Sequence, residues 1–310
     1  MKAQSKTPLK EPKFNNLLDV AKRFPDETSC REFLELIRWN GKPICPHCSF
    51  SEKVYRLNGG KLYKCGNPKC YKPFSIKVGT IFEDSALPLQ KWFYAFFIVS
   101  AHKKGISSCQ LARDISITQK SAWHMLHRIR HAMKTKSFDK PLKGTIEADE
   151  TYVGGKHKGK RGRGSENKTP VFGMVARGGE VRSMPVQDVK RSTLHPIIRK
   201  NIAKGSNVMT DELQSYNGLN QDYTHERISH LKKEYVRDGV HTQNIENFWS
   251  LLKRGILGIY HHVDKDHLHR YCDEFQYRYN SRKSDDTQRF NALLSQVNGR
   301  LQYRELVGRS

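Results

Sequence analysis

The segment TIEADETYV, residues 145–153, is central to the predicted fold of this chain. β-Branched and aromatic side chains are frequent in it, so it predicts a strand that carries Asp149 near its centre. The sequence downstream predicts three more strands and three helices, namely strands 170–177, 180–188 and 207–211 and helices 193–204, 244–257 and 267–280. Strands, a crossover helix, a further strand and packed helices together predict a mixed-sheet α/β domain.

Upstream of that domain, residues 43–78 predict short strands and turns. Asn58-Gly59-Gly60 separates two runs of alternating character, which is a signal for a β-hairpin. Two cysteine pairs bracket this hairpin, as C-x2-C and C-x4-C, at Cys45, Cys48, Cys65 and Cys70.

Two tight turns that each offer two thiolates supply the tetrahedral sulfur set that structural Zn²⁺ takes. We therefore expect one structural zinc in a zinc ribbon, with no open position for catalysis. Four buried or free thiols are the alternative, but that interpretation leaves the bracketed hairpin unexplained. The other cysteines, Cys30, Cys109 and Cys272, are expected in the core. Seven cysteines in this arrangement indicate a metal site in a reducing compartment rather than a disulfide framework.

Between the ribbon and the α/β domain, the pattern is helical. One helix is predicted from about residue 89 to Gly105, and two shorter ones at 107–117 and 118–133, with Ser107 and Thr118 as N-caps. The last two predict a helix-turn-helix unit whose second helix could enter a major groove. A helical hairpin that merely links domains is the alternative. The second helix is expected to expose polar residues for DNA contact, namely Gln119, Lys120, Ser121, His124, His127 and Arg128.

The charge of the chain points to a polyanionic partner. Its 310 residues include 55 Lys and Arg against 31 Asp and Glu, a formal net charge of +24. Nucleic acid is the first candidate for such a partner. No apolar run approaches the ~18 residues of a membrane-spanning helix, and residues 1–14 lack the apolar segment of a secretory signal.

Acidic residues are scarce, so their positions carry information. Asp149 lies in the first predicted strand, Asp211 ends the strand 207–211, and Glu246 begins a predicted helix. Carboxylates brought together from two adjacent strands and a helix can hold two Mg²⁺ or Mn²⁺ ions for phosphodiester chemistry. Lys253 lies two helical turns after Glu246 and could hold a DNA phosphate. The alternative is that each acid is a solvated or salt-bridged surface residue.

These motifs resemble those of DDE-type insertion-sequence transposases of the ISXO2-like group, which carry an N-terminal zinc ribbon and an RNase H-like catalytic domain. The resemblance covers about residues 15 to 300 and is carried by CPHC with CGNPKC, IEADETYVGGKHKGKRGRG, VMTDELQSY, and HTQNIENFWSLLKRGILGIYHHV with HLHRYCDEFQYRYNSR. Taken together with the patterns above, it predicts a helical segment at 1–40, a ribbon at 41–80, a helix-turn-helix at 85–135 and the catalytic domain at 143–300.

The resemblance also implies cleavage at transposon ends and strand transfer into target DNA. It implies that Asp149, Asp211 and Glu246 are metal ligands and that Lys253 is the companion cation. In this group the third acid can be replaced by Asn or His, so His241, Asn244 and Asn247 are alternatives to Glu246. Glu150 and Glu212 rank second because a strand points them to the opposite face.

A basic loop at 154–164 is expected to clamp the DNA backbone through Lys156, Lys158, Lys160, Arg161 and Arg163. A solvated charge run is its alternative. The expected partners are double-stranded terminal inverted repeats and target DNA, with no membrane, in a homodimer or larger assembly, within the bacterial cytoplasm at the nucleoid. A non-catalytic DNA-binding regulator, a structure-specific nuclease on the same fold and an RNA-binding scaffold are the rival functions.

Overall fold

The computed structural model describes residues 13–134, 140–154, 168–228 and 240–308. These residues form two compact units. The first takes the described residues within Met1–His102, Ala112–Ile117 and Ser284–Ser310, and the second takes those within Lys103–Leu111 and Thr118–Lys283.

The first unit combines helices with a small sheet. Its elements are α1 (Leu17–Arg23), α2 (Glu27–Trp39), β1 (Val54–Leu57), η1 (Asn58–Gly60), β2 (Leu62–Cys65), β3 (Pro73–Phe74), α3 (Leu89–Ala101), α9 (Asp286–Ser295) and α10 (Tyr303–Leu306). The strands form an antiparallel sheet in the order β1-β2-β3, which confirms the predicted hairpin at Asn58-Gly59-Gly60.

Aromatic side chains fill the core of the first unit. The ring of Phe24 lies within 5.8 Å of the rings of Phe14, Phe33 and Phe93, centroid to centroid. Tilted and edge-on pairs of this kind add to the free energy of burial. Helix α2 starts at a capping box in which the Asp26 side chain accepts from the backbone N–H of Ser29.

The second unit is built on a five-stranded mixed sheet. Its elements are α5 (Gln119–Ala132), β4 (Thr145–Gly154), β5 (Lys168–Ala176), β6 (Val181–Pro185), α6 (Arg191–Asn201), β7 (Asn207–Thr210), η3 (Gln214–Tyr216), η4 (Leu219–Gln221), β8 (Thr224–Arg227), α7 (Gln243–Gly255), the π-helical turn η6 (Ile256–Tyr260) and α8 (Leu268–Asn280). The strand order is β6-β5-β4-β7-β8, antiparallel from β6 to β4 and parallel from β4 to β8. This is the mixed-sheet α/β domain that the sequence predicts, and its strand order and directions agree with the RNase H-like domain that the resemblance implies.

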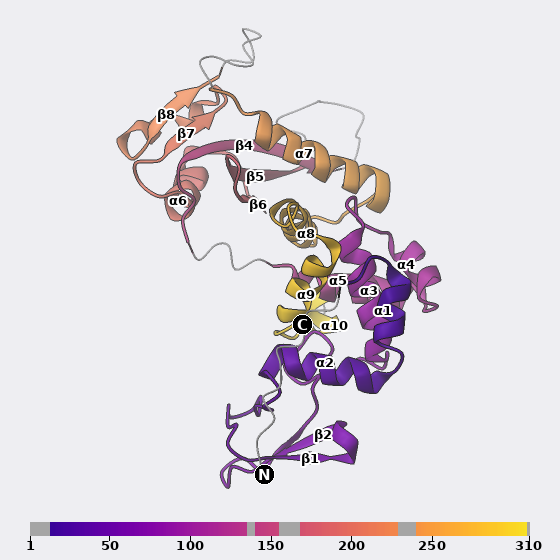
Figure 1. Cartoon of the computed structure of the whole chain (residues 1–310). Coiled ribbons are helices and arrows are strands. Elements are labelled where there is room, and N and C mark those ends of the chain that lie inside the picture. Colours follow the sequence, from indigo (N-terminus) through magenta and orange to yellow (C-terminus); the bar gives the residue numbers. More distant parts are fainter. Residues whose placement is uncertain (1–12, 135–139, 155–167, 229–239, 309–310) are drawn as a thin grey trace. The chain divides into compact units, whose positions relative to one another are not determined.

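Each face of that sheet has its own hydrophobic layer, because alternate residues of a strand point to opposite faces. Ile146 and Ala148 of β4 pack with α6, while Val153 packs with α7 and α8. Figure 1 shows α7 running along β4 and β5. Even-numbered residues of β4 therefore face α6, and odd-numbered residues face α7.

Several boundaries differ from the sequence predictions. Helix α3 ends at Ala101 rather than at Gly105, where φ is +95°. Strand β8 and the helices α9 and α10 were not predicted. Helix α4 (Ser108–Asp114) has residues in both units.

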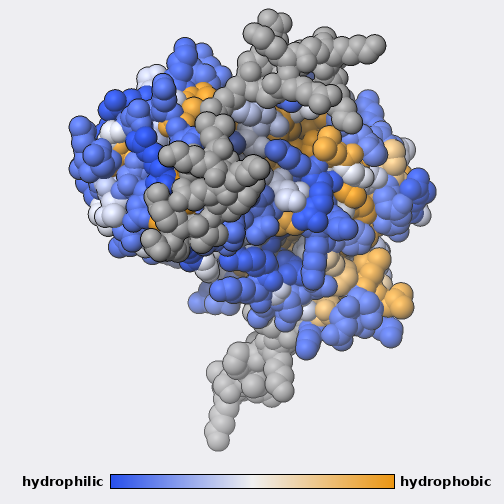
Figure 2. Space-filling model, turned by 90° about the horizontal axis from the view of Figure 1, so that it is seen from above, coloured by the Kyte–Doolittle hydropathy of each residue, from blue (hydrophilic) through white to orange (hydrophobic). Residues whose placement is uncertain are grey.

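Among the described residues, the structure has no helix of the length and apolarity needed to cross a membrane. Figure 2 shows one face of the molecule coloured mainly as hydrophilic, with apolar colour in scattered patches, in keeping with the high content of charged residues.

Candidate active site

Two parallel strands bring Asp149 and Asp211 to the same level of the sheet. Asp149 lies in β4, and Asp211 directly follows the last residue of β7. Glu147 of β4 is paired with Met209 of β7, so two further residues along each strand place Asp149 beside Asp211. The chain then turns, and the backbone N–H of Leu213 donates to Asp211 Oδ1 at 2.9 Å. Asp211 is therefore held at the edge where β7 ends.

Glu150 joins these two aspartates. One carboxylate oxygen each from Asp149, Glu150 and Asp211 can be chosen so that all three lie within 4.8 Å of one another. The side chain of Glu150 starts on the α6 face, as the sequence predicts, and Tyr216 Oη donates to its Oε2 at 2.8 Å. However, β7 stops at Thr210, so this edge of β4 is open and Glu150 can approach Asp149 around it.

The pKa of Asp149 is shifted by its burial and by its two acidic neighbours. Burial, followed by the negative charges of Glu150 and Asp211, raises the pKa of Asp149 to about 7. Hydrogen bonds from the backbone N–H of Glu150 and from Trp249 oppose that shift. Such repulsion favours a bound divalent cation, which binds the charged carboxylates directly. Oxygens that share one Mg²⁺ lie about 3–4 Å apart, so this hard-oxygen donor set fits Mg²⁺ or Mn²⁺.

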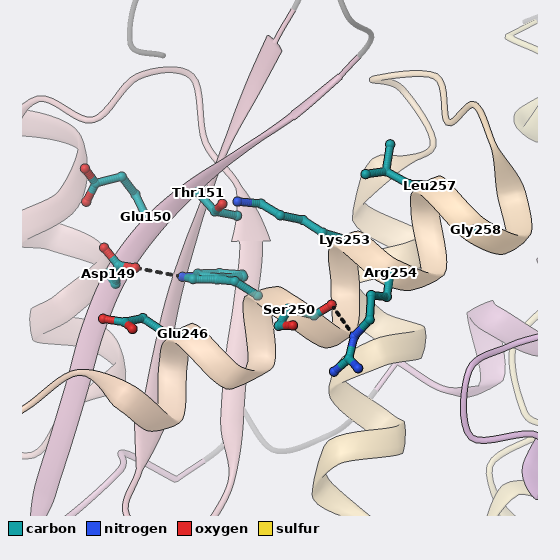
Figure 3. A pocket seen from close by; sticks show the side chains of 10 residues that line it. Asp149, Glu150, Thr151, Glu246, Ser250, Lys253, Arg254, Leu257 and Gly258 are labelled. Carbon is teal, nitrogen blue, oxygen red and sulfur yellow. Dashed lines mark hydrogen bonds between the residues drawn. The ribbon is translucent and has the colours of Figure 1, made fainter. Parts of the chain in front are cut away.

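Helix α7 contacts Asp149 through an indole ring. Trp249 Nε1 donates to Asp149 Oδ2 at 2.9 Å (Figure 3). The ring can reach that position only because Gly173, which pairs with Asp149 in β5, has no side chain. A Cβ at Gly173 would lie 2.5 Å from Trp249 Cη2 and 3.0 Å from Ile245 Cδ1.

A second acid of β4, Glu147, fixes the start of α7. Glu147 is fully buried, and its carboxylate accepts from the backbone N–H groups of Asn244 and Ile245 at 2.8 and 3.2 Å. Arg177 Nε and Asn244 Nδ2 also donate to it, at 2.8 and 2.7 Å. These backbone N–H groups lack partners within the helix, so Glu147 acts as a remote N-terminal cap.

A cavity of about 760 Å³ opens beside Asp149. Figure 3 shows Asp149, Glu150 and Glu246 at one end of it and Lys253 and Arg254 towards the other. Its lining residues from β4 and from α7 with η6 are Asp149, Glu150, Thr151, Glu246, Trp249, Ser250, Lys253, Arg254, Leu257 and Gly258. Carboxylates at one end and cations further along suit a phosphodiester held by its neighbouring phosphates.

Glu246 lines this cavity, but within the described chain it is outside the group of acids that lie within 4.8 Å of one another. Thr242 Oγ1 donates to Glu246 Oε1 at 2.8 Å. Of the alternatives to Glu246, Asn244 is bound to Glu147, and His241 Nδ1 lies 3.2 Å from the same carboxylate. Asn247 is exposed.

The zinc ligands meet in the first unit. One sulfur from each of Cys45, Cys48, Cys65 and Cys70 lies within 4.8 Å of the others. The Cys45–Cys70 and Cys48–Cys65 sulfur distances are 3.9 and 3.6 Å. A tetrahedron with Zn–S bonds of about 2.3 Å has edges of about 3.8 Å, so the four thiols fit a zinc ion. Cys109 is exposed, contrary to the core position expected for it, while Cys30 and Cys272 are buried.

The predicted DNA-contacting residues of α5 differ in exposure. Gln119 and Lys120 are exposed, and Gln119 Nε2 donates to Ser108 Oγ at 2.8 Å. The expected exposure of His127 and Arg128 is wrong, since both are buried. The His127 ring packs against Trp123 and Tyr271 because α8 covers this side of α5. His124 is partly buried, and burial lowers its pKa to about 4.

The basic-loop residues lie outside the described part of the chain, namely Lys156, Lys158, Lys160, Arg161 and Arg163. Sequence reasoning did not identify Glu147, Gly173 or the hydrogen bond of Trp249. One signal was available: Glu147 and Asp149 are two residues apart in a strand and so share a face, which is unusual on a buried surface.

Two family models match this chain. The ISXO2-like transposase domain matches residues 141–280, and the transposase zinc-ribbon domain matches residues 25–72. Among curated proteins, an uncharacterized protein in the transposable element ISH50 of Halobacterium salinarum is 31% identical over 281 residues, covering 83% of this chain and 92% of the relative. An uncharacterized transposase-like protein of Haemophilus influenzae is 32% identical over 103 residues, covering 33% of this chain and 82% of the relative.

Two solved structures are also similar in part. A pre-cleavage Mos1 transpososome aligns with a TM-score of 0.25 and 12% identity over 63% of this chain and 75% of its own. The Mos1 strand transfer complex aligns with a TM-score of 0.25 and 11% identity over 71% and 82%. A TM-score this low establishes no shared fold. The family models and the Halobacterium relative, by contrast, agree with the carboxylate cluster and the four thiols, and they show that this chain is a DDE-type transposase of the ISXO2-like family.

Proposed function

We propose that Asp149, Asp211 and Glu246 hold two divalent ions, Mg²⁺ or Mn²⁺, and that this site cleaves transposon ends and joins them to target DNA. Membership of the family implies use of a divalent metal, a zinc ion in the ribbon and DNA as the partner. The proposal rests on one observation above all: Asp149 and Asp211 lie together, with a raised Asp149 pKa, beside a cavity that also contains Glu246.

The chemistry requires two in-line substitutions at phosphorus. In the first, a water oxygen forms a bond to phosphorus and the bond to the 3′ oxygen breaks, which leaves a 3′-hydroxyl. In the second, that hydroxyl attacks a target phosphodiester, so one P–O bond replaces another and the enzyme is never covalently attached. The bound ions would activate the attacking oxygen and stabilise the leaving one.

The residues of the chain would position the substrate. Lys253 and Arg254 line the cavity beyond the acids and would pair with phosphates next to the scissile one. Trp249 orients the Asp149 carboxylate through its 2.9 Å hydrogen bond. Glu147 holds the first turn of α7. Glu246 projects from that turn, and Lys253 projects from the last turn of the same helix.

The third acid can be identified by comparing two neutral variants. If Glu246 is the third ligand, Glu246→Gln abolishes cleavage and weakens Mn²⁺ binding, whereas Glu150→Gln, which keeps an acceptor for Tyr216, retains measurable cleavage. The reverse result would transfer this role to Glu150.

The proposal also covers which DNA is recognised, which residues contact it and how many copies of the chain assemble on it. We assign terminal inverted repeats and target DNA as substrates, with contacts from Gln119, Lys120 and the basic loop at 154–164. Because two ends must be joined in one event, a homodimer or larger assembly on DNA is expected.

The decisive experiment is a cleavage assay. The protein is incubated with Mg²⁺ and DNA that carries the element's own ends, and cleavage at the 3′ ends is measured. Asp149→Asn is expected to abolish cleavage while end binding stays measurable by gel shift. Asp266→Asn, at an exposed acid outside the cavity, is the matched control. Cleavage that survives in the Asp149 variant would show that the active site is wrongly placed.

A further inference from the structure

The zinc ribbon has one face that the fold does not use. In the hairpin, Tyr55 pairs with Lys64 and Leu57 pairs with Leu62, so these four side chains share a face of the sheet. The opposite face carries Tyr63 and Phe74, whose stacked rings are buried. Only one face of this small sheet is therefore needed for the core.

The unused face is apolar and aromatic to an unusual degree. Tyr55, Leu57, Leu62 and the neighbouring Tyr71 are 36–52% exposed, although large apolar side chains seldom cluster on a solvent face. Two lysines accompany them: Lys53 Nζ lies 5.4 Å from the centroid of the Tyr55 ring, and Lys64 Nζ lies 5.5 Å from that of Tyr71. We call these six residues the hairpin face.

The positive charge of the ribbon favours a polyanionic partner. Residues 43–78 contain six Lys and one Arg against a single Glu, so the module stays cationic even after four thiolates and one Zn²⁺ are counted. A two-stranded β-ribbon can enter the major groove of a DNA duplex, where apolar side chains contact the thymine methyl group. Lysines at the margins of such a ribbon are placed to reach phosphates.

We propose that the hairpin face is a DNA-docking surface that enters the major groove, with Lys53 and Lys64 on phosphates and Leu57 and Leu62 against base edges. This inference rests on DNA being the substrate, but it concerns the first unit, whereas the carboxylate cavity lies in the second. The ribbon would then have a recognition role in addition to its zinc-dependent fold.

Equilibrium binding of the full-length, zinc-loaded protein to a fluorescent end duplex, without added Mg²⁺, tests the phosphate contacts. Each contact contributes about 0.9 to the slope of log K against log salt, so Lys53→Ala/Lys64→Ala should lower the slope by about 1.8. Taking 1 M salt as the point where counterion release vanishes, this is about a 30-fold loss of affinity at 0.15 M. Lys22→Ala/Lys200→Ala removes equal charge from exposed sites on α1 and α6 as the matched control.

An equal loss of DNA affinity in the two double variants would show that only the total charge of the protein matters, and it would overturn the proposal. If the Lys53→Ala/Lys64→Ala variant binds DNA as tightly as the wild-type protein, the proposal is also overturned, and the hairpin face would serve another kind of partner. For the groove contact, Leu57→Ser/Leu62→Ser should reduce the preference for the end duplex over a random duplex about tenfold with an unchanged salt slope. An unchanged preference contradicts that contact.

A measurement on the unmodified protein keeps the test valid if a variant folds poorly. Bound duplex should protect Lys53 and Lys64 from acetylation, as read by mass spectrometry, and leave Lys22 reactive. Equal reactivity of all three lysines with and without DNA contradicts the proposal. Because binding is measured without Mg²⁺, failure here leaves the chemistry proposed at Asp149 untouched.

Discussion

Replacing Trp249 with Phe tests whether the indole N–H tunes the metal site. The variant keeps an aromatic ring above Gly173 but removes the 2.9 Å hydrogen bond to Asp149 Oδ2. A hydrogen bond to a charged group contributes about 1.5–3 kcal/mol, and the lower value applies because Asp149 is partly exposed. Since 1.4 kcal/mol is a factor of ten, we expect protons to bind Asp149 about tenfold more tightly in the variant.

The effect on metal binding then depends on pH. The pKa of Asp149 is raised to about 7 by burial and by its acidic neighbours, so about half of the carboxylate is ionised at pH 7. Tenfold tighter proton binding lowers that fraction to about one-tenth, which weakens Mn²⁺ binding about fivefold at pH 7. At pH 9 both proteins are ionised, and the difference should nearly vanish.

Calorimetric titration of Mn²⁺ into the DNA-free protein at pH 6, 7 and 9 measures this dependence. Trp92→Phe is the matched control, because Trp92 Nε1 donates to the neutral Ser85 Oγ at 3.1 Å in the first unit. That variant is expected to lower thermal stability and to leave Mn²⁺ affinity unchanged. Equal Mn²⁺ affinity of Trp249→Phe and wild type at pH 6 would refute the reasoning. A loss of Mn²⁺ affinity that is the same at every pH would refute it as well.

Three further outcomes are expected. Cys45→Ser should release zinc and lower the melting temperature of the first unit, and full zinc retention by mass spectrometry would contradict the ribbon site. Gly173→Ala should destabilise the second unit by about 1–3 kcal/mol in urea unfolding, because its Cβ would lie 2.5 Å from the Trp249 ring; unchanged stability would show that the ring can move. Burial alone would raise the pKa of Glu274, but Arg130 and Arg278 lower it to about 2. That contribution, on the order of 3 kcal/mol, is present above the unfolded pKa of 4.5 and is lost as the pH falls towards 2, so Glu274→Gln should flatten acid unfolding over that range.

Local rules were enough to predict the features that depend on nearby residues. The spacing of Cys45, Cys48, Cys65 and Cys70 around Asn58-Gly59-Gly60 predicts both the hairpin and the thiol cluster, because the turn geometry is set within the segment. The strand at 145–153 follows from its composition in the same way. In α7, the two turns between Glu246 and Lys253 predict that both lie on one face of the helix, and both line the same cavity.

Features that depend on where a neighbouring element stops could not be predicted. The approach of Glu150 to Asp149 requires β7 to end at Thr210 and leave the edge of β4 open. The burial of His127 is likewise a tertiary effect, since α8 packs on a side of α5 that its polar sequence marks as exposed. Periodicity identifies an apolar stripe, but it does not show how far a packed neighbour widens the buried surface.

The acids on the α7 face of β4 explain how one strand can serve both the fold and the chemistry. Glu147 and Asp149 are two residues apart, and both contact α7, but their partners differ in charge. Glu147 faces Arg177 and two helix N–H groups, so its negative charge is compensated by the protein itself. Asp149 instead faces Glu150 and Asp211, and burial together with these two acids raises its pKa, so that a bound cation would compensate its charge. Because α7 is anchored at the first acid and meets the second through Trp249, the helix that carries Glu246 and Lys253 has its position set by the strand that carries Asp149. A variant that disturbs Glu147 should therefore impair cleavage without altering any proposed metal ligand.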